Sequence, residues 1–465
     1  MSKMVQEEGS SSVTSSPLKV FSMMSLSPSL GSPFPWLREM KSEERGLYLI
    51  QLLISCANQV AAGSLENANI GLEHISHLAS PGGDTMQRIA SYFTEALADR
   101  VLKSWTGIYK AINATKMSIA ADKILAQKLF FQLCPFLKLS YLMTNQAIMK
   151  AMEGEKMVHI IDLFSFEPAQ WISLLQEFKA RPEGPPHLRI TGIHEQKEVL
   201  EHMAFCLTEE AEKLDISFQF HSFVGKLENV DVECLRVKTG EALAVSSVLQ
   251  LHYLLASEVD MCKRNSSSIA SNSNITHLQR NLHNQRTFRE WLEKDLGNIY
   301  SLSPEPDSMS PSSNKMENFL TSLGSLSPKI VVITEQESNH NGASLMERVT
   351  ESLYYYAALF DCLESTIPRT SAERLKVEKM LFGEEIKNII GCEGLERKER
   401  HEKLEKWIMR MELAGFERVG FGVWNGERLL QQGYDGYEMK EENGCLFLCW
   451  HERPLFSVSA WRFRR

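Results

Sequence analysis

Beyond residue 156 the chain alternates short apolar runs with helical segments, and this alternation restricts its fold more than any other feature. The first run consists of Val158, His159, Ile160, Ile161 and Asp162. An apolar run of this length is typical of a strand that is buried on both faces of a parallel sheet. Later runs predict strands at 188–193, 216–220, 242–249 and 330–334. Because helical segments lie between the early runs, we predict an α/β fold with a doubly wound, mostly parallel sheet.

The part of the chain before this sheet has the periodicity of helices. From Ser42 onward, apolar side chains recur every three or four positions, as Leu49 and Leu53 illustrate. Ser42 is expected to cap the first of these helices. We therefore predict a mainly helical cap over residues 42–155 and an α/β core over residues 156–463.

Two segments have compositions that disfavour a packed core. Residues 1–41 are rich in Ser and Pro, and residues 256–327 are rich in Ser and Asn, with one expected helix at 287–296. Such segments bury too little apolar surface to offset the entropy lost on ordering. We predict a disordered N-terminal arm and a largely disordered insertion within the core.

The end of the chain carries the signal of a β-hairpin. Two runs, Tyr437–Glu442 and Cys445–Trp450, flank the dipeptide Asn443-Gly444. Asn-Gly is the preferred sequence of a two-residue hairpin turn, because both positions adopt positive φ there. A last strand is predicted at 455–461.

Three helices are predicted between the last parallel strand and the hairpin, at 343–364, 374–392 and 396–413. Residues 396–410 are dense in both Glu and Lys or Arg. We interpret them as a solvated helix with i,i+4 ion pairs. A nucleic-acid-binding face is the alternative, although a net charge of -9 and a pI of about 5.9 disfavour a large DNA-binding surface.

The composition also indicates the compartment. The nine cysteines are scattered and odd in number, which favours reduced thiols over a disulfide framework. The first thirty residues lack the apolar centre of a signal peptide. No apolar run approaches the ~18–20 residues that a membrane-spanning helix needs. We expect a soluble intracellular protein.

The turn after the first strand lacks the chemistry of a nucleotide or S-adenosylmethionine site. Such sites use glycines, which let backbone N–H groups approach the ligand. Residues 163–167 contain no glycine, and Phe164 and Phe166 occupy the place of a cofactor. Glu167, at the start of the next helix, would repel an anion. We therefore expect no bound cofactor, and we interpret Asp162 as a structural acid.

The sequence offers no grouped catalytic or metal-binding residues. It contains no P-loop, no Gly-x-Ser-x-Gly elbow, no His-Glu-x-x-His motif and no zinc-finger spacing. Cys445, Cys449 and His451 share one face of the hairpin, but a metal site would need a further ligand. We expect buried thiols there, and we predict neither catalytic residues nor a metal site.

Leu49, Leu52 and Leu53 form a Leu-x-x-Leu-Leu box on the first predicted helix. Such a box can bind in the groove of a partner protein. All three leucines lie on the apolar face of that helix, which favours a simpler role in the core. We name these three leucines as the partner-binding residues to test first.

Several stretches of the chain resemble the plant GRAS family. Residues 158–162 are similar to its VHIID signature, and Ser459, Ala460 and Trp461 are similar to its terminal SAW element. Other stretches resemble its leucine-rich and PFYRE regions: 47–102, 240–252, 351–364, 382–386 and 392–402. Because the stretches follow the family's order, a GRAS domain is predicted over residues 42–463. Residues 417–430 depart from the family's pattern, which puts a surface built there in doubt.

The resemblance implies a Rossmann-like, methyltransferase-like core with an N-terminal helical cap and a C-terminal β-hairpin. It also implies a nuclear transcriptional regulator or co-regulator, with roles in gibberellin signalling and root development. Members of the family act through contacts with other GRAS and DELLA proteins and with zinc-finger transcription factors, so contact with DNA is mainly indirect; homo- or heterodimers are implied too. Two alternatives stay open: an S-adenosylmethionine-type enzyme on the same core, and direct sequence-specific DNA binding.

Overall fold

The computed structural model describes residues 41–114, 120–256, 314–421 and 436–464. Nearly all of the predicted arm and most of the predicted insertion, with its expected helix at 287–296, lie outside these residues. Residues 422–430 of the atypical segment also lie outside them.

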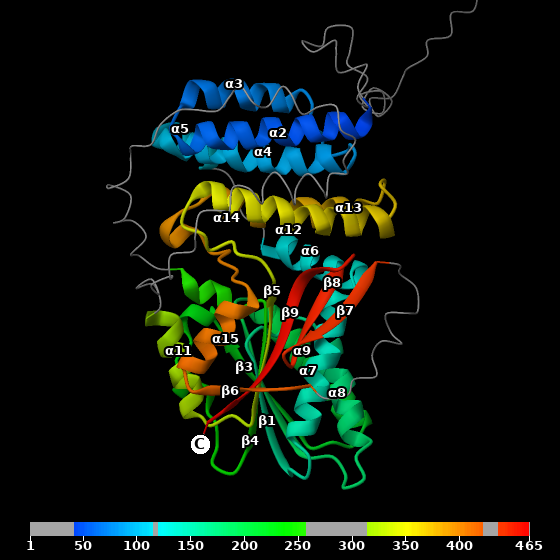
Figure 1. Cartoon of the computed structure of the whole chain (residues 1–465). Helices are drawn as coiled ribbons and strands as arrows, with labels where there is room; N and C mark the ends of the chain where they lie inside the picture. Colours follow the sequence, from blue (N-terminus) through cyan, green and yellow to red (C-terminus); the bar gives the residue numbers. More distant parts are fainter. Residues whose placement is uncertain (1–40, 115–119, 257–313, 422–435, 465) are drawn as a thin grey trace, which may run out of the picture.

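The described chain forms a central sheet flanked by helices, beneath layers of further helices (Figure 1). The strand order is β3-β2-β1-β4-β5-β9-β8-β7, and β6 pairs with β9. The first five strands are parallel: β1 (Met157–Asp162), β2 (His187–His194), β3 (Phe218–Val224), β4 (Ala242–Val248) and β5 (Ile330–Gln336). The others are antiparallel: β6 (Phe416–Val419), β7 (Tyr437–Glu442), β8 (Cys445–Trp450) and β9 (Arg453–Phe463). The prediction of a mostly parallel α/β sheet with a C-terminal hairpin is confirmed.

Strand limits were predicted less well than strand existence. The third strand was expected at 216–220, whereas β3 begins at Phe218 and ends at Val224. Ile216 is buried in the core, but it lies in the link between a helix and β3, next to Asp215 with φ of 52°. The four-residue strand β6 was not predicted, because so short a run carries no periodicity.

Each face of the sheet has its own apolar core. Ile160 of β1 lies in the core that the first group of helices covers, and its neighbour Ile161 lies in the other, as strand alternation requires. The first group is α7 (Phe136–Ala151), α8 (Ala169–Lys179) and α9 (Lys197–Lys213). The second group is α11 (Asn314–Ser325) and α15 (Leu404–Leu413), with the short helices η2 (Leu227–Asn229), η3 (Val232–Leu235) and η4 (Leu251–Leu255).

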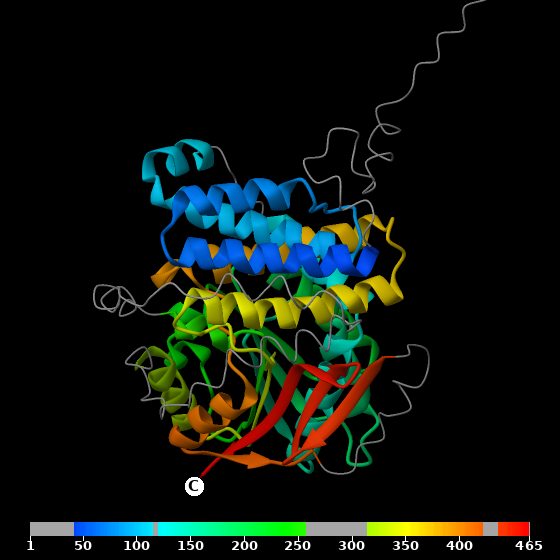
Figure 2. The same ribbon diagram turned by 45° about the horizontal axis from the view of Figure 1, so that its top comes forward.

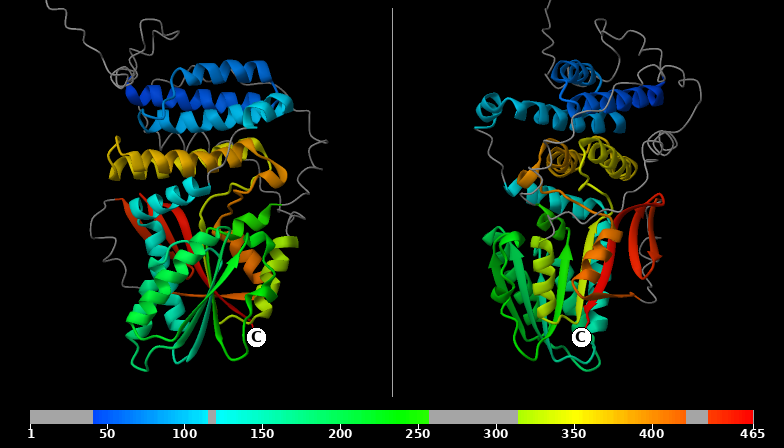
Figure 3. Two further views of the ribbon diagram at one scale, coloured as in Figure 1. Left: turned by 180° about the vertical axis from the view of Figure 1, so that it is seen from behind. Right: turned by 60° about the vertical axis from the view of Figure 1, so that its left-hand side comes forward.

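Helices from both halves of the chain stack beyond one end of the sheet (Figures 2 and 3). The outer layer is α2 (Ser42–Ala61), α3 (Leu65–Ser76), α4 (Thr85–Ser104) and α5 (Thr106–Asn113). Beneath it lie α6 (Ala120–Leu133), α12 (Leu345–Thr366), α13 (Ala372–Val377), the π-helical turn Glu378–Gly383 and α14 (Glu384–Gly391). The cap is therefore not the continuous segment 42–155 that we predicted. α12 and α14 pack against α4, whereas α7 packs against α8 and β5.

Three further predictions need correction. The helix expected at 396–413 covers only Leu404–Leu413, and Gly394–Glu396 forms a single 3-10 turn, η10. The insertion expected to end at 327 contains α11, whose Met316, Leu320 and Leu323 are buried against the sheet. The first helix begins with Ser42 as its first residue, and its cap residue is Lys41.

In the described part of the chain, no helix combines the length and the apolar content that a membrane span requires.

Candidate functional site

In an open α/β sheet, ligands bind at the carboxyl ends of the strands where the strand order reverses. Here that place lies between β1 and β4. The backbone of the turn after β1 is already engaged within the protein. The Leu163 N–H donates to the Ser246 carbonyl at 2.9 Å, and the Ser165 N–H donates to the Ile193 carbonyl at 2.9 Å. The Phe164 N–H donates to Asp162. None of these three groups is directed at a ligand.

Aromatic rings occupy this end of the sheet. Phe164 and Phe166 stack with their centroids 5.8 Å apart, and Phe164 also contacts the ring of His194. Both phenylalanines line a cavity of about 60 Å³ between the sheet and the cap. Cofactor and substrate pockets usually measure ~300–1,000 Å³. The cavity is too small for a nucleotide or S-adenosylmethionine, which supports the expectation drawn from the glycine-free turn.

Asp162, at the end of β1, has the contacts of a structural acid. It is buried, and its carboxylate accepts hydrogen bonds from the Ser165 hydroxyl and the Trp171 indole N–H, both at 2.8 Å. Burial raises the pKa of this carboxyl, and the hydrogen bonds oppose that rise. Asp162 therefore ties the strand end to the next helix.

His159 lies in the interior of the same strand, away from the turn. It is fully buried, and its ring contacts the Thr191 hydroxyl at 2.9 Å and Arg189 at 3.1 Å. Burial and the positive charge of Arg189 lower the pKa of His159 to about 4, despite the nearby Glu241. The neutral ring is part of the core.

We expect His159→Gln to flatten the acid side of the pH-stability curve. The folded pKa of about 4 is lower than the unfolded value of about 6.5. Stability contributed by neutral His159 is therefore present above about pH 6.5 and is lost as the pH falls toward 4, by up to about 3 kcal/mol. Urea unfolding of the original protein and of His159→Gln at several pH values from 7 to 4 measures how the free energy of unfolding of each depends on pH. Parallel curves for the two proteins would contradict this assignment.

The SAW residues lie on β9, where they join the parallel and antiparallel parts of the sheet. Ser459 and Trp461 pair with Ile333 and Val331 of β5. Trp461 is fully buried, and its indole N–H donates to the Ser459 hydroxyl at 2.9 Å. With Ala460 also buried, the motif closes the core and offers no surface.

The structure places the Leu-x-x-Leu-Leu box largely inside the cap. Leu49 and Leu53 are 2% and 0% exposed, and Leu52 is partly buried against the same core. This burial supports the core interpretation for Leu49 and Leu53. Partner binding through Leu52 stays a prediction.

The segment that follows α14 was misread from the sequence. Residues 396–403 were interpreted as a solvated helix, yet Arg397 and Arg400 are 3% and 2% exposed. Arg397 donates to the His340 carbonyl, and Arg400 donates to Arg397 and Gly394 carbonyls. A DNA-binding face built on these two arginines is incompatible with their burial.

This buried segment completes a polar cluster that sequence reasoning missed. Glu399 and His401 meet His252, from η4, and Glu335, at the end of β5. Burial opposes a charged His252, but Glu335 and Glu399 outweigh it and raise its pKa to about 9. A charge run without helical apolar spacing, preceded by Gly391 and Gly394, was the signal that could have revealed an irregular buried segment.

Cys445 and Cys449 are both fully buried, as expected for structural thiols, and His451 is exposed.

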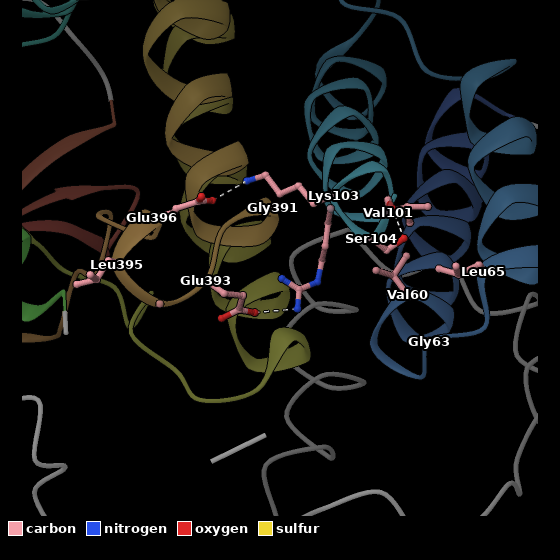
Figure 4. Close-up of a pocket in the computed structure, with 12 residues that line it drawn as sticks. Val60, Gly63, Leu65, Val101, Lys103, Ser104, Gly391, Glu393, Leu395 and Glu396 are labelled. Carbon is pink, nitrogen blue, oxygen red and sulfur yellow. Dashed lines mark hydrogen bonds and ion pairs between the residues drawn. The ribbon is translucent and has the colours of Figure 1, made fainter. Parts of the chain in front are cut away.

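A second hollow, of about 850 Å³, lies between the outer cap layer and the segment after α14 (Figure 4). We call it the cap groove. Its lining residues are Val60, Gly63, Leu65, Arg100, Val101, Lys103, Ser104, Gly391, Glu393, Gly394, Leu395 and Glu396. Two ion pairs span it, Arg100–Glu393 at 2.8 Å and Lys103–Glu396 at 3.5 Å.

Exposed apolar side chains accompany the cap groove. Leu395 in its wall is 47% exposed. Helix α5, which begins two residues after Ser104, presents Ile108 and Ile112 at 52% and 49% exposure. These two residues are four positions apart and so share one face of the helix. α5 and the end of α14 lie at the same end of the helical layers (Figure 1).

Comparison with known proteins gives a consistent result. The profile of the GRAS domain family matches residues 49–462. Scarecrow-like protein 3 of Arabidopsis thaliana is 60% identical, with all of both chains covered. DELLA protein GAI1 of Vitis vinifera is 34% identical over 90% of this chain and 62% of its own length. Scarecrow-like transcription factor PAT1 of Arabidopsis thaliana is 31% identical over 88% of this chain and 75% of its own length. The crystal structure of SCL7 of Oryza sativa superposes with a TM-score of 0.67 and 28% identity, covering 89% of this chain and 99% of that one.

Proposed function

This chain belongs to the GRAS domain family, and from that premise we propose that it is a nuclear regulator of transcription that works through protein–protein contacts. Its similarity to a transcription factor and to a DELLA protein supports a role in transcriptional regulation rather than in catalysis. The volumes of the two cavities support contact with proteins. The cavity at the carboxyl ends of the strands, where a cofactor would bind, measures about 60 Å³, whereas the cap groove measures about 850 Å³.

The cap groove and the exposed face of α5 form the surface that we assign to the partner. This surface combines exposed apolar side chains, Leu395 and Ile108 among them, with two ion pairs, and interfaces between proteins combine apolar and charged groups in the same way. A helix with one apolar face is the occupant that fits such a groove. Its source would be another GRAS or DELLA protein; zinc-finger transcription factors would supply most of the contact with DNA. Gibberellin signalling and root development are the processes that we propose for it.

We expect the double variant Ile108→Asp, Leu395→Asp to bind a purified DELLA GRAS domain at least about 30-fold more weakly, because charges would replace apolar anchors. Both side chains are about half exposed, so the fold should survive. Phe205→Asp is the matched control, since Phe205 is 66% exposed on α9. Surface plasmon resonance measures all three proteins. Unchanged binding by the double variant, or equal weakening by the control, would contradict the assignment.

The two alternatives have direct tests. Calorimetry with S-adenosylmethionine should show no micromolar binding, because the cavity at the strand ends is too small. A gel-shift titration with DNA alone should show only weak retention, lost steeply as salt rises. Micromolar binding of the cofactor, or a salt-resistant shift, would favour the corresponding alternative.

A further inference from the structure

Three potential metal ligands meet in the buried cluster beneath the cap. The His252 Nε2 lies 3.2 Å from the Glu399 Oε2, and the His401 Nε2 lies 3.5 Å from that same oxygen. The three ligand atoms all lie within 4.8 Å of one another, and the three residues are buried. The ligands of a tetrahedral zinc ion, at about 2.0–2.1 Å from the metal, are separated by about 3.3 Å. Two of the three separations therefore already match a zinc site, and the third, between the two imidazoles, is at most 4.8 Å.

In His252 and His401, the ring nitrogen that points away from Glu399 contacts another buried group. The His252 Nδ1 lies 2.8 Å from the Glu335 Oε2, which is the carboxylate–histidine arrangement found behind many metal ligands. Glu335 is itself fixed, because its other oxygen accepts the N–H groups of Gln250 and Leu251.

A histidine supports the second ligand. The His401 Nδ1 lies 2.9 Å from the His340 Nδ1, and the His340 Nε2 lies 2.9 Å from the Ser338 hydroxyl. When His401 donates from Nδ1 to His340, and His340 donates from Nε2 to Ser338, a lone pair on the His401 Nε2 faces Glu399. That arrangement requires a cation between the two groups. Without a cation, the two protons shift so that the His401 Nε2 donates to Glu399.

The charges also suit a divalent ion. Two buried carboxylates, Glu335 and Glu399, contact one imidazole, His252. A divalent ion bound beside them would balance the two negative charges. Lys123, on the wall of the adjoining cavity, is exposed, so solvent screens its charge.

Space and a hydrogen-bond acceptor for a further ligand adjoin the cluster. His252, Glu399 and His401 line the cavity of about 60 Å³, which has room for a few waters. Gln336 lines the same cavity, and its buried Oε1 has no hydrogen-bond partner among the described residues. A metal-bound water would supply that oxygen with a donor.

We propose that His252, Glu399 and His401 bind one divalent ion of the zinc class, with water from the cavity as the fourth ligand. The ion would join η4, next to the sheet, to the segment that leads from the cap back to α15. Sequence spacing gave no sign of this site, because 147 positions separate His252 from Glu399.

The test is a titration of the full chain with Zn²⁺ and Co²⁺. Half-buried Cys206 and exposed His202, 3.7 Å apart on α9, form a pair that could bind zinc, so every protein carries His202→Ala and Cys206→Ser. Calorimetry in two buffers of different ionisation enthalpy should show one ion bound with release of at least one proton at pH 7. Co²⁺ should give the visible bands of a four-coordinate ion without thiolate charge transfer.

Three variants locate the ion. His401→Gln and Glu399→Gln should each weaken Zn²⁺ binding at least 100-fold, and Glu335→Gln should weaken it about 10- to 100-fold through His252. Circular dichroism checks that each variant is folded; if one is not, the Co²⁺ spectrum of the parent protein decides. Absence of a bound ion in the parent, or binding that His401→Gln and Glu399→Gln leave unchanged, would overturn the proposal.

Discussion

Replacement of Arg88 by leucine is expected to lower the free energy of unfolding by about 3–5 kcal/mol, because it leaves a buried carboxylate without one of its partners. Arg88 is 1% exposed on α4 and bridges Glu364 of α12, at 2.8 Å, and Glu378 of the π-helical turn, at 3.2 Å. Glu378 is fully buried and would keep only Arg374. Through these two ion pairs, Arg88 links the outer layer of the cap to the inner one.

Arg369→Leu is the matched control for Arg88→Leu. Arg369 contacts the same Glu364, but its side chain is 52% exposed. Solvent-exposed ion pairs contribute about 0–1 kcal/mol, so this change should cost less than about 1 kcal/mol. Urea unfolding followed by circular dichroism measures both variants. Equal losses for the two would show that burial of the pair does not determine its strength.

Replacement of Asp162 by alanine is expected to cost about 2–5 kcal/mol of stability, because two buried donors lose their acceptor. Those donors are the Trp171 indole N–H and the Ser165 hydroxyl. Asp162→Asn keeps one acceptor oxygen and should cost clearly less. Thermal unfolding measures both.

The same pair of variants separates a structural acid from a functional one. If Asp162→Asn lost partner binding or a ligand while its stability matched that of the original protein, Asp162 would be a functional residue. We expect that each variant loses partner binding only to the extent that it loses stability.

The predictable parts of the fold are those that local sequence determines. The hairpin limits around Asn443-Gly444 are correct to the residue, because a two-residue turn fixes its own geometry. The run 158–162 is predictable as a buried strand because it is short and mostly apolar, and all five of its positions are buried. Limits of the edge strand β3 were wrong, since one exposed side weakens its apolar pattern.

The misread parts are those that distant contacts determine. Arg397 and Arg400 look solvated in sequence, yet backbone carbonyls of Gly394, Arg397 and His340 bind their guanidinium groups. Carbonyl acceptors leave no trace in side-chain composition. The cluster of His252 and Glu399 was also invisible in the sequence, because only the folded chain brings η4, β5 and the segment after α14 together.

Affinity purification from plant nuclei, with identification of the bound proteins, tests the central claim most directly. Three forms are compared: the original protein, the double variant Ile108→Asp, Leu395→Asp, and the control Phe205→Asp. Our account predicts that GRAS, DELLA or zinc-finger regulators accompany the original protein and the control, and that the double variant loses them at an equal protein level. If the original protein retained no such regulators, or the double variant retained the same set, regulation through the cap groove would be contradicted.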